Sequence, residues 1–113
     1  MELKVYDKPL FIEGLTFRMP VEKVEEYLRI EKEIWFEDLC TLPGFVGGET
    51  WVSEDNPGEV TCLYFWESEE AYKSIDPEFS KDHKDRTNQA IDTEFICAWH
   101  GENKRFKVRE FHK

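Results

Sequence analysis

The sequence predicts an α+β protein with the element order β-α-β-β-α-β, in which an antiparallel sheet carries helices on one face. Three observations support this: period-two apolar alternation in four segments, helical spacing in the stretches between them, and Pro or Gly at most junctions. This order is that of the ferredoxin-like fold. A length of 113 residues fits one domain. We therefore expect a single domain over 1–113, with its core over about 10–100 and a basic tail over 101–113.

The first two elements are a strand and a long helix. Residues 10–18 alternate apolar side chains and are expected to form the strand. The helix is expected over 21–42, because Pro20 suits its start and the Pro43–Gly44 pair ends it. Its apolar stripe at helical spacing consists of Val21, Val24, Leu28, Trp35, Leu39 and Leu42.

The remaining elements follow from the same signals. Two strands joined by the turn at 55–58 form a hairpin. In the tail, Phe106 and Val108 alternate with basic residues, which favours a short fifth strand. In chain order we expect strands over 45–53 and 59–66, a short helix from Ser68 to about Ile75, a helix from Pro77 to about Ala90, and a strand over 93–100.

The predicted sheet is apolar on both faces. Successive side chains of a strand point to opposite faces, and here both sets are apolar. The strand over 59–66 places Val60, Cys62, Tyr64 and Trp66 opposite to Leu63 and Phe65. The strand over 93–100 is expected to place Phe95, Cys97 and Trp99 opposite to Ile96 and Ala98.

Two helices cover only one face of such a sheet, and an antiparallel sheet in a monomer normally leaves the other face polar. The simplest cover for the second face is a second copy of the sheet across a twofold axis. We therefore predict a homodimer that forms a dimeric α/β barrel.

Charge restricts the partners. The net charge is −10, and residues 104–113 carry a local +4, so residues 1–103 carry −14. An acidic surface repels phosphate backbones, which argues against nucleic acid as a partner. The basic tail is expected to dock on the acidic body or on a second subunit. No apolar run approaches the about 20 residues of a membrane span, and no secretion signal is evident, so we expect no membrane partner and a cytoplasmic location.

Glu31 is the first candidate catalytic residue. At 100° per residue it falls beside Leu28 and Trp35, within or at the border of the apolar stripe. Desolvation there favours the uncharged form of a carboxyl group, which suits an acid or base that works near neutral pH. The alternative is that Glu31 lies at the edge of the stripe and reaches water or Arg18.

His83 is the second candidate. In the helix after Pro77 it shares a face with Phe79 and Thr87 at four-residue spacing. A histidine that points into a helix–sheet cleft can act as an acid, a base or an axial metal ligand. The alternative is a structural histidine at the rim of the cleft.

The aromatic residues suggest a ligand. Four tryptophans are many for this length, and flat aromatic walls suit a planar organic molecule, although they also fill cores. Trp35, Trp66 and Phe79 are the candidate walls. No nucleotide-binding or zinc motif occurs and the three cysteines lack metal-site spacing, so we expect no cofactor and no metal.

Four segments resemble a known group in their order and spacing: Glu31–Trp35, Pro43–Trp51, Pro57–Val60 and Phe65–Ile75. The chain is similar to the antibiotic-biosynthesis-monooxygenase-like superfamily of dimeric α+β barrels. Within it, the chain most resembles a small uncharacterised bacterial family with an acid-x-x-Ile-Trp helix and a Pro-Gly-Phe turn. The likeness covers about residues 10–100 and implies a homodimer with a small-molecule cleft between helices and sheet.

The resemblance implies two activities. Cofactor-independent members oxidise electron-rich phenols by removing a proton and excluding water, which would make Glu31 or His83 the proton-handling group. Haem-degrading members use a histidine on the second helix, and His83 matches it; their tryptophan and asparagine positions here hold about Ser74–Ile75 and Gly14 or Leu15. Haem binding through His83 is therefore an alternative, and a non-catalytic dimeric ligand-binding module is another.

Overall fold

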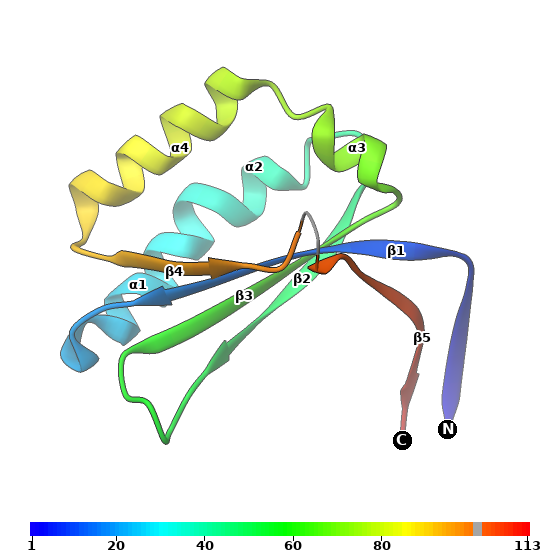
Figure 1. The fold of residues 1–113 in the computed structure, drawn as a ribbon, viewed down its shortest axis with the longest axis horizontal. Coiled ribbons are helices and arrows are strands. Elements are labelled where there is room, and N and C mark those ends of the chain that lie inside the picture. Colours follow the sequence, from blue (N-terminus) through cyan, green and yellow to red (C-terminus); the bar gives the residue numbers. More distant parts are fainter. Residues whose placement is uncertain (101–102) are drawn as a thin grey trace.

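The computed structural model describes residues 1–100 and 103–113, and an antiparallel sheet forms the frame of this part of the chain (Figure 1). The strand order is β2-β3-β1-β4, and β5 pairs with the N-terminal part of β1. Every strand pair is antiparallel. The strands are β1 (Glu2–Arg18), β2 (Phe45–Val52), β3 (Glu59–Trp66), β4 (Glu94–Ala98) and β5 (Arg105–His112).

The helices of the described residues lie on one face of the sheet (Figure 1). The first helical stretch consists of η1 (Val21–Lys23), α1 (Val24–Ile30), the π-helical η2 (Glu31–Phe36) and α2 (Glu37–Leu39). The second region consists of α3 (Glu69–Lys73) and α4 (Pro77–Ala90). The predicted fold class is confirmed: an α+β, ferredoxin-like arrangement with an antiparallel sheet and helices on one face.

The expected helix starts have their capping residues in place. The Ser68 side chain accepts a hydrogen bond from the backbone N–H of Ala71 at the start of α3. The Asp76 side chain does the same for Glu78, and Pro77 follows as the first residue of α4. Both helices therefore begin where the sequence predicts.

The first helix differs from its prediction in length and in phase. It ends at Leu39 rather than at residue 42, and it widens into π-helix at Glu31. Val21 is 60% exposed although the predicted stripe includes it, whereas Tyr27 is buried although the stripe does not. A π-helical segment holds more residues per turn, so the buried face before it is offset by about one residue from an α-helical count that fits the stripe after it.

Strand β4 contradicts the predicted alternation over 93–100. Phe95 pairs with Phe17 and Ala98 pairs with Leu15, with a register shift between Thr16 and Phe17. Phe95 and Ala98 therefore share the helix-facing side, where the prediction placed them on opposite faces. The β-bulge is the cause, because one extra residue in a strand reverses the facing of everything beyond it.

Strand β1 begins at Glu2, well before the predicted start at residue 10, and β5 is the predicted fifth strand. Their paired ends form an arm that bends away from the rest of the sheet (Figure 1). The bend coincides with a register shift between Val5 and Leu10, which tolerates Pro9 within the strand. Residues 101 and 102, at the start of the expected basic tail, lie outside the described residues.

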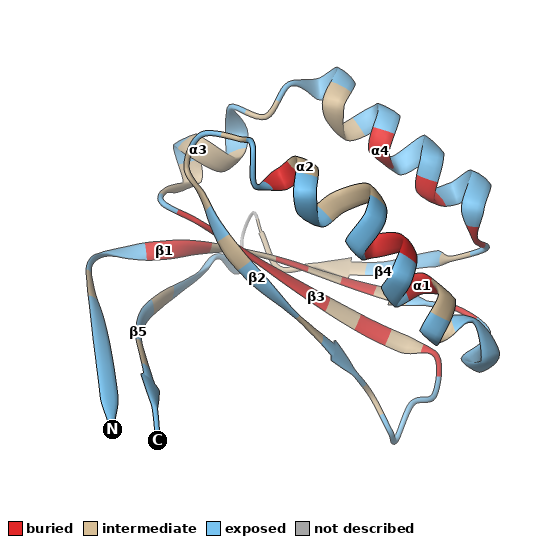
Figure 2. Ribbon diagram, turned by 180° about the vertical axis from the view of Figure 1, so that it is seen from behind, coloured by how far each residue is buried: buried red, intermediate tan, exposed pale blue. Residues whose placement is uncertain are grey.

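The main core lies between the sheet and the helices, and β3 is its most buried strand (Figure 2). A second cluster lies on the other face of the sheet, where Tyr6, Ile12 and Trp99 pack around three buried residues, Leu10, Leu63 and Phe65. The Arg105 guanidinium lies 4.8 Å from the Trp99 ring, and the Lys107 ammonium lies 4.4 Å from the Phe65 ring.

Leu10, Leu63 and Phe65 on the second face are thus buried within one chain, while Trp51 of β2 on the same face is 50% exposed. Apolar side chains of the arm stay exposed, among them Leu3 at 54%, Val5 at 62% and Phe111 at 68%. Among the described residues, no helix combines the length and the apolar character that a membrane crossing requires.

Candidate active site

A cavity of about 660 Å³ lies between the sheet and the helices. This volume is within the range of small-molecule sites, and most of its wall is apolar or aromatic. Its lining includes Glu13, Leu15 and Phe17 from β1, Tyr27 from α1, Trp35 from η2, Tyr64 from β3, Tyr72 from α3, Phe79, Lys84 and Thr87 from α4, and Phe95 and Ala98 from β4.

Glu13 is the acidic residue in this wall, and the sequence argument did not select it. Burial raises its pKa from 4.5 to about 7, opposed by a hydrogen bond from the Trp66 indole and by the positive charge of Lys84. The Trp66 Nε1–H donates to Glu13 Oε1 over 3.3 Å. Period-two alternation puts Glu13 on the same face as Phe11 and Leu15, and this was the available signal.

Glu31 is close to the cavity but is not one of the residues that line it. It is 1% exposed, which confirms the predicted desolvated position. It accepts hydrogen bonds from the hydroxyl of Tyr64 (2.6 Å), the thiol of Cys62 (2.7 Å) and the hydroxyl of Thr50 (2.8 Å). Tyr64 lines the cavity and Glu31 does not, so the direct contact of Glu31 with the cavity wall is its hydrogen bond from that phenol.

The groups around Glu31 hold their protons firmly. Burial, together with the neighbouring charge of Glu31, raises the pKa of the Cys62 thiol and of the Tyr64 phenol. The Tyr27 hydroxyl extends the cluster, with its oxygen 3.8 Å from the Cys62 sulfur. Burial is also the main reason why the pKa of Tyr27 is raised. The cluster therefore contains protonated donors around one carboxyl group.

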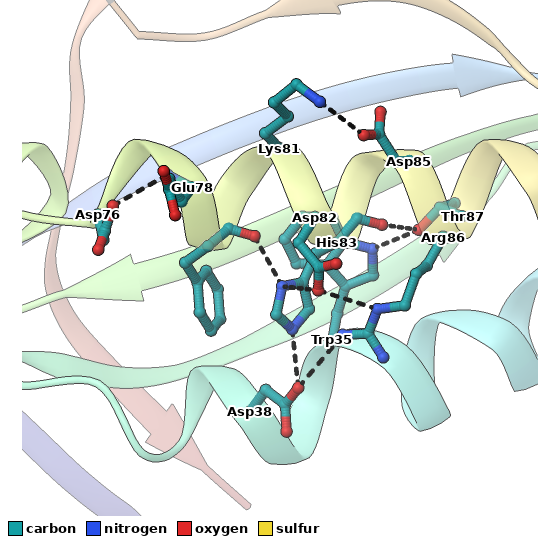
Figure 3. Close-up of polar contacts among 11 residues, drawn as sticks. Trp35, Asp38, Asp76, Glu78, Lys81, Asp82, His83, Asp85, Arg86 and Thr87 are labelled. Carbon is teal, nitrogen blue, oxygen red and sulfur yellow. Dashed lines mark hydrogen bonds and ion pairs between the residues drawn. The ribbon is translucent and has the colours of Figure 1, made fainter.

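His83 joins two helices (Figure 3). It is 4% exposed, with Nε2 at 2.7 Å from Asp38 Oδ2 and Nδ1 at 2.7 Å from the carbonyl oxygen of Phe79. The Asp38 pKa is lowered, mainly by this hydrogen bond. Trp35 reaches the same turn of α4, since its Nε1–H donates to Thr87 Oγ1 over 2.9 Å. His83 therefore lies between α2 and α4 and not in the wall of the cavity.

A haem with His83 as axial ligand does not fit these residues. Coordination requires a ring nitrogen lone pair that points at the iron, and both nitrogens of His83 face oxygen acceptors of the chain. The Phe79 ring, stacked at 3.9 Å on the imidazole, separates it from the cavity. Within 1–100 and 103–113, no group of three or more His, Cys, Asp or Glu is placed to hold a metal ion.

The structure places two of the three candidate wall residues, Trp35 and Phe79, in the cavity lining. Trp66 is fully buried and lies behind Glu13, to which it donates its hydrogen bond. The candidates are thus divided between two clusters on either side of the first helix. Glu31 contacts the sheet, and His83 contacts α2 and the Phe79 carbonyl.

Several solved structures have the same fold. A protein of Bacteroides thetaiotaomicron, described as a "putative antibiotic biosynthesis monooxygenase", is 25% identical with a TM-score of 0.55, covering 78% of this chain and 86% of that one. The monooxygenase of the gene ActVA-Orf6 of Streptomyces coelicolor, in complex with nanaomycin D, is 19% identical with a TM-score of 0.64, covering 80% and 88%. A dimeric ferredoxin-like protein from an uncultured marine organism is 16% identical with a TM-score of 0.62, covering 95% of each chain.

No protein-family model and no curated protein sequence matches the chain. The chain has the fold of the antibiotic-biosynthesis-monooxygenase-like superfamily, as its sequence motifs predicted. The predicted likeness to one small bacterial family within this superfamily stays a prediction.

Proposed function

We propose that the protein binds a planar phenolic molecule in the cavity beside Glu13 and oxidises it with dioxygen, without a cofactor. The observation that carries this proposal is a carboxyl group with a pKa of about 7 in a largely apolar, aromatic-lined cavity. A base with such a pKa is half ionised at neutral pH, where proton abstraction by a carboxylate is efficient. The monooxygenases of this fold support the choice of reaction.

The ionised Glu13 would take a proton from an activated CH₂ group of the ring system. The resulting carbanion is electron-rich enough to react with dioxygen directly, and the apolar wall keeps water away from it. In the balanced reaction, R₂CH₂ and O₂ give R₂C=O and H₂O, so one oxygen atom enters the substrate and the other leaves as water. Both electron pairs come from the substrate, and no further reductant is needed.

The other candidate residues would position these groups. Trp35 and Phe79 form walls for the ring system, and Trp66 fixes the Glu13 carboxyl by its 3.3 Å hydrogen bond. Glu31 holds Tyr64, and His83 holds the backbone of Phe79. In this arrangement Glu31 and His83, which the sequence argument selected for proton transfer, instead hold residues of the cavity wall in position.

Oxygen consumption with anthrone as the substrate tests the proposal. We expect anthrone-dependent uptake by the wild type and its loss in Glu13→Gln, while Glu54→Gln, in the exposed turn after β2, keeps the wild-type rate. Uptake that survives in Glu13→Gln would contradict the role of Glu13. Anthrone binding without oxygen uptake would indicate the non-catalytic ligand-binding module instead.

We also propose that the protein is a homodimer, with the arm of β1 and β5 as the main contact. Exposed Leu3, Val5 and Phe111 provide the apolar surface. The local +4 of residues 104–113 complements the −14 of the rest of the chain. The dimeric neighbour supports this choice of partner. Sedimentation at micromolar concentration should give a dimer, and a Leu3→Glu, Phe111→Glu variant should give a monomer; a wild-type monomer would contradict the proposal.

A further inference from the structure

The hydrogen bonds below the cavity all run in one direction. The thiol of Cys62 and the hydroxyl of Tyr64 both donate to Oε2 of Glu31, and the hydroxyl of Thr50 donates to Oε1. Since the Cys62 proton is directed at Glu31, its sulfur is left to accept from the hydroxyl of Tyr27, 3.8 Å away. The protons of Thr50, Cys62 and Tyr64 therefore point toward the same buried carboxyl group, which is not part of the cavity wall.

The direction of these hydrogen bonds determines whether the Tyr64 hydroxyl donates to a ligand or accepts from it. A phenol has one proton to donate, and the proton of Tyr64 is held by Glu31 over 2.6 Å. The capacity that remains on its oxygen is that of an acceptor. Tyr72, another tyrosine of the cavity wall, makes no hydrogen bond to Glu31, so its hydroxyl is not committed to donate to that carboxyl group.

We propose that Tyr64, held by Glu31, is a specificity-determining acceptor that selects ligands carrying an un-ionised O–H group. This inference rests on the proposed function, because it names which phenolic molecules the same cavity accepts. Tyr64 is also the cross-strand partner of Glu13 in the β1–β3 ladder. A ligand hydroxyl on Tyr64 thus stays protonated, and deprotonation is directed to the position that faces Glu13.

The competing role for Glu31 is purely structural. A carboxylate that only stabilises the fold would leave the relative affinities of two ligands unchanged when it is replaced. If Glu31 has the role proposed here, Glu31→Gln changes the ratio of the two affinities, because the amide at position 31 has N–H groups to donate to Tyr64. The Tyr64 proton is then free to point at the ligand, and the preference for a donor decreases.

Equilibrium dialysis at about pH 6, where Glu13 is mostly protonated, with 1-naphthol and its methyl ether, 1-methoxynaphthalene, tests the inference. The two probes share a ring system and differ in the O–H donor. We expect the wild type to bind the naphthol about tenfold more tightly than the ether. That ratio should fall to about one in Tyr64→Phe and in Glu31→Gln. In the matched control Tyr72→Phe, both affinities can change but the ratio should persist.

The outcomes separate the inference from the function on which it rests. A ratio of about one in the wild type, or a ratio that survives in Tyr64→Phe, overturns the inference and leaves the aromatic cavity standing. Failure of the wild type to bind either probe contradicts the proposed function itself. Should Tyr64→Phe fail to fold by circular dichroism, Glu31→Gln decides, since an unchanged ratio there overturns the inference as well.

Discussion

Glu13 and Tyr64 are cross-strand partners in the β1–β3 ladder, and both line the cavity under the helices. Side chains that are directly opposite in an antiparallel pair lie close together on one face of the sheet. One of the pair has a pKa of about 7, and the other has its proton held by Glu31. A base and an acceptor are thus placed side by side in an otherwise largely apolar wall.

The oxygen-uptake rate should depend on pH through Glu13. The carboxylate is the active form, so the rate with anthrone should rise as the pH increases, with its midpoint near 7. In a Glu13→Asp variant the carboxyl group is withdrawn by one methylene, so the remaining rate should be lower. A rate that falls as the pH rises through 7 would identify a general acid and exclude the base assigned here.

The free energy of unfolding should fall as the pH rises over the range in which the oxygen-uptake rate increases. The folded-state pKa of Glu13 lies above the ordinary 4.5, so folding favours its protonated form. Stability is lost as the pH rises from 4.5 to about 7 and is constant above that. Glu13→Gln should remove this loss, on the order of 2 kcal/mol. Urea unfolding at about pH 5 and pH 8 measures it.

Other carboxyl groups affect stability over a lower pH range than Glu13 does. The pKa values of Asp38, Glu69 and Glu110 are lowered mainly by their hydrogen bonds with His83, Lys104 and Lys107, respectively. Their contribution is present above their unfolded-state pKa and is lost only as the pH falls below it. Identical pH dependence in the wild type and in Glu13→Gln between about pH 5 and 8 would show that Glu13 is not the buried acid.

His83 should matter for stability. Its side chain is buried and makes hydrogen bonds to Asp38 and to the Phe79 carbonyl, so His83→Ala should cost about 2 kcal/mol or more. On the same helix, Lys81→Ala breaks an exposed ion pair with Asp85 and should cost less than about 1 kcal/mol. Equal losses in urea titrations of the two variants would contradict the structural role of His83.

Haem binding provides a second test of His83. Because both ring nitrogens are engaged within the chain, a haem titration followed by absorbance should give no Soret shift that depends on His83. The wild type and His83→Ala should give the same spectra. A saturable shift near one haem per subunit that vanishes in His83→Ala would instead establish the haem-binding alternative, and would require the Asp38 contact to open.

The sequence predicted most of the fold because its signals are local. Ser68, Asp76 and Pro77 mark helix starts by their own chemistry, and the strand over 59–66 coincides with β3. The bulge in β4 and the π-helical turn at Glu31 carry no such mark. The bulge and the π-helical turn both depend on packing against other elements. Each offsets the observed buried face by about one residue from the predicted one.

The site was predicted less completely because it depends on which residues meet. A polar residue in a buried helical stripe is conspicuous, and Glu31 is indeed buried. Glu13 alternates with apolar residues in a strand, where a glutamate usually faces water, and only the position of the helices shows that its side faces the cavity. His83 is on the expected helix, but its partner Asp38 comes from a helix distant in sequence.

The most direct measurement of the central claim is a ¹H–¹⁵N NMR titration of the wild type with 1-naphthol. Trp35 lines the cavity, whereas Trp51 is exposed on β2 and its indole N–H donates to Glu49 over 3.0 Å. The account predicts that the Trp35 indole signal shifts saturably while that of Trp51 stays in place. A titration in which Trp35 does not respond, or in which Trp51 alone shifts, would contradict the placement of the ligand in this cavity.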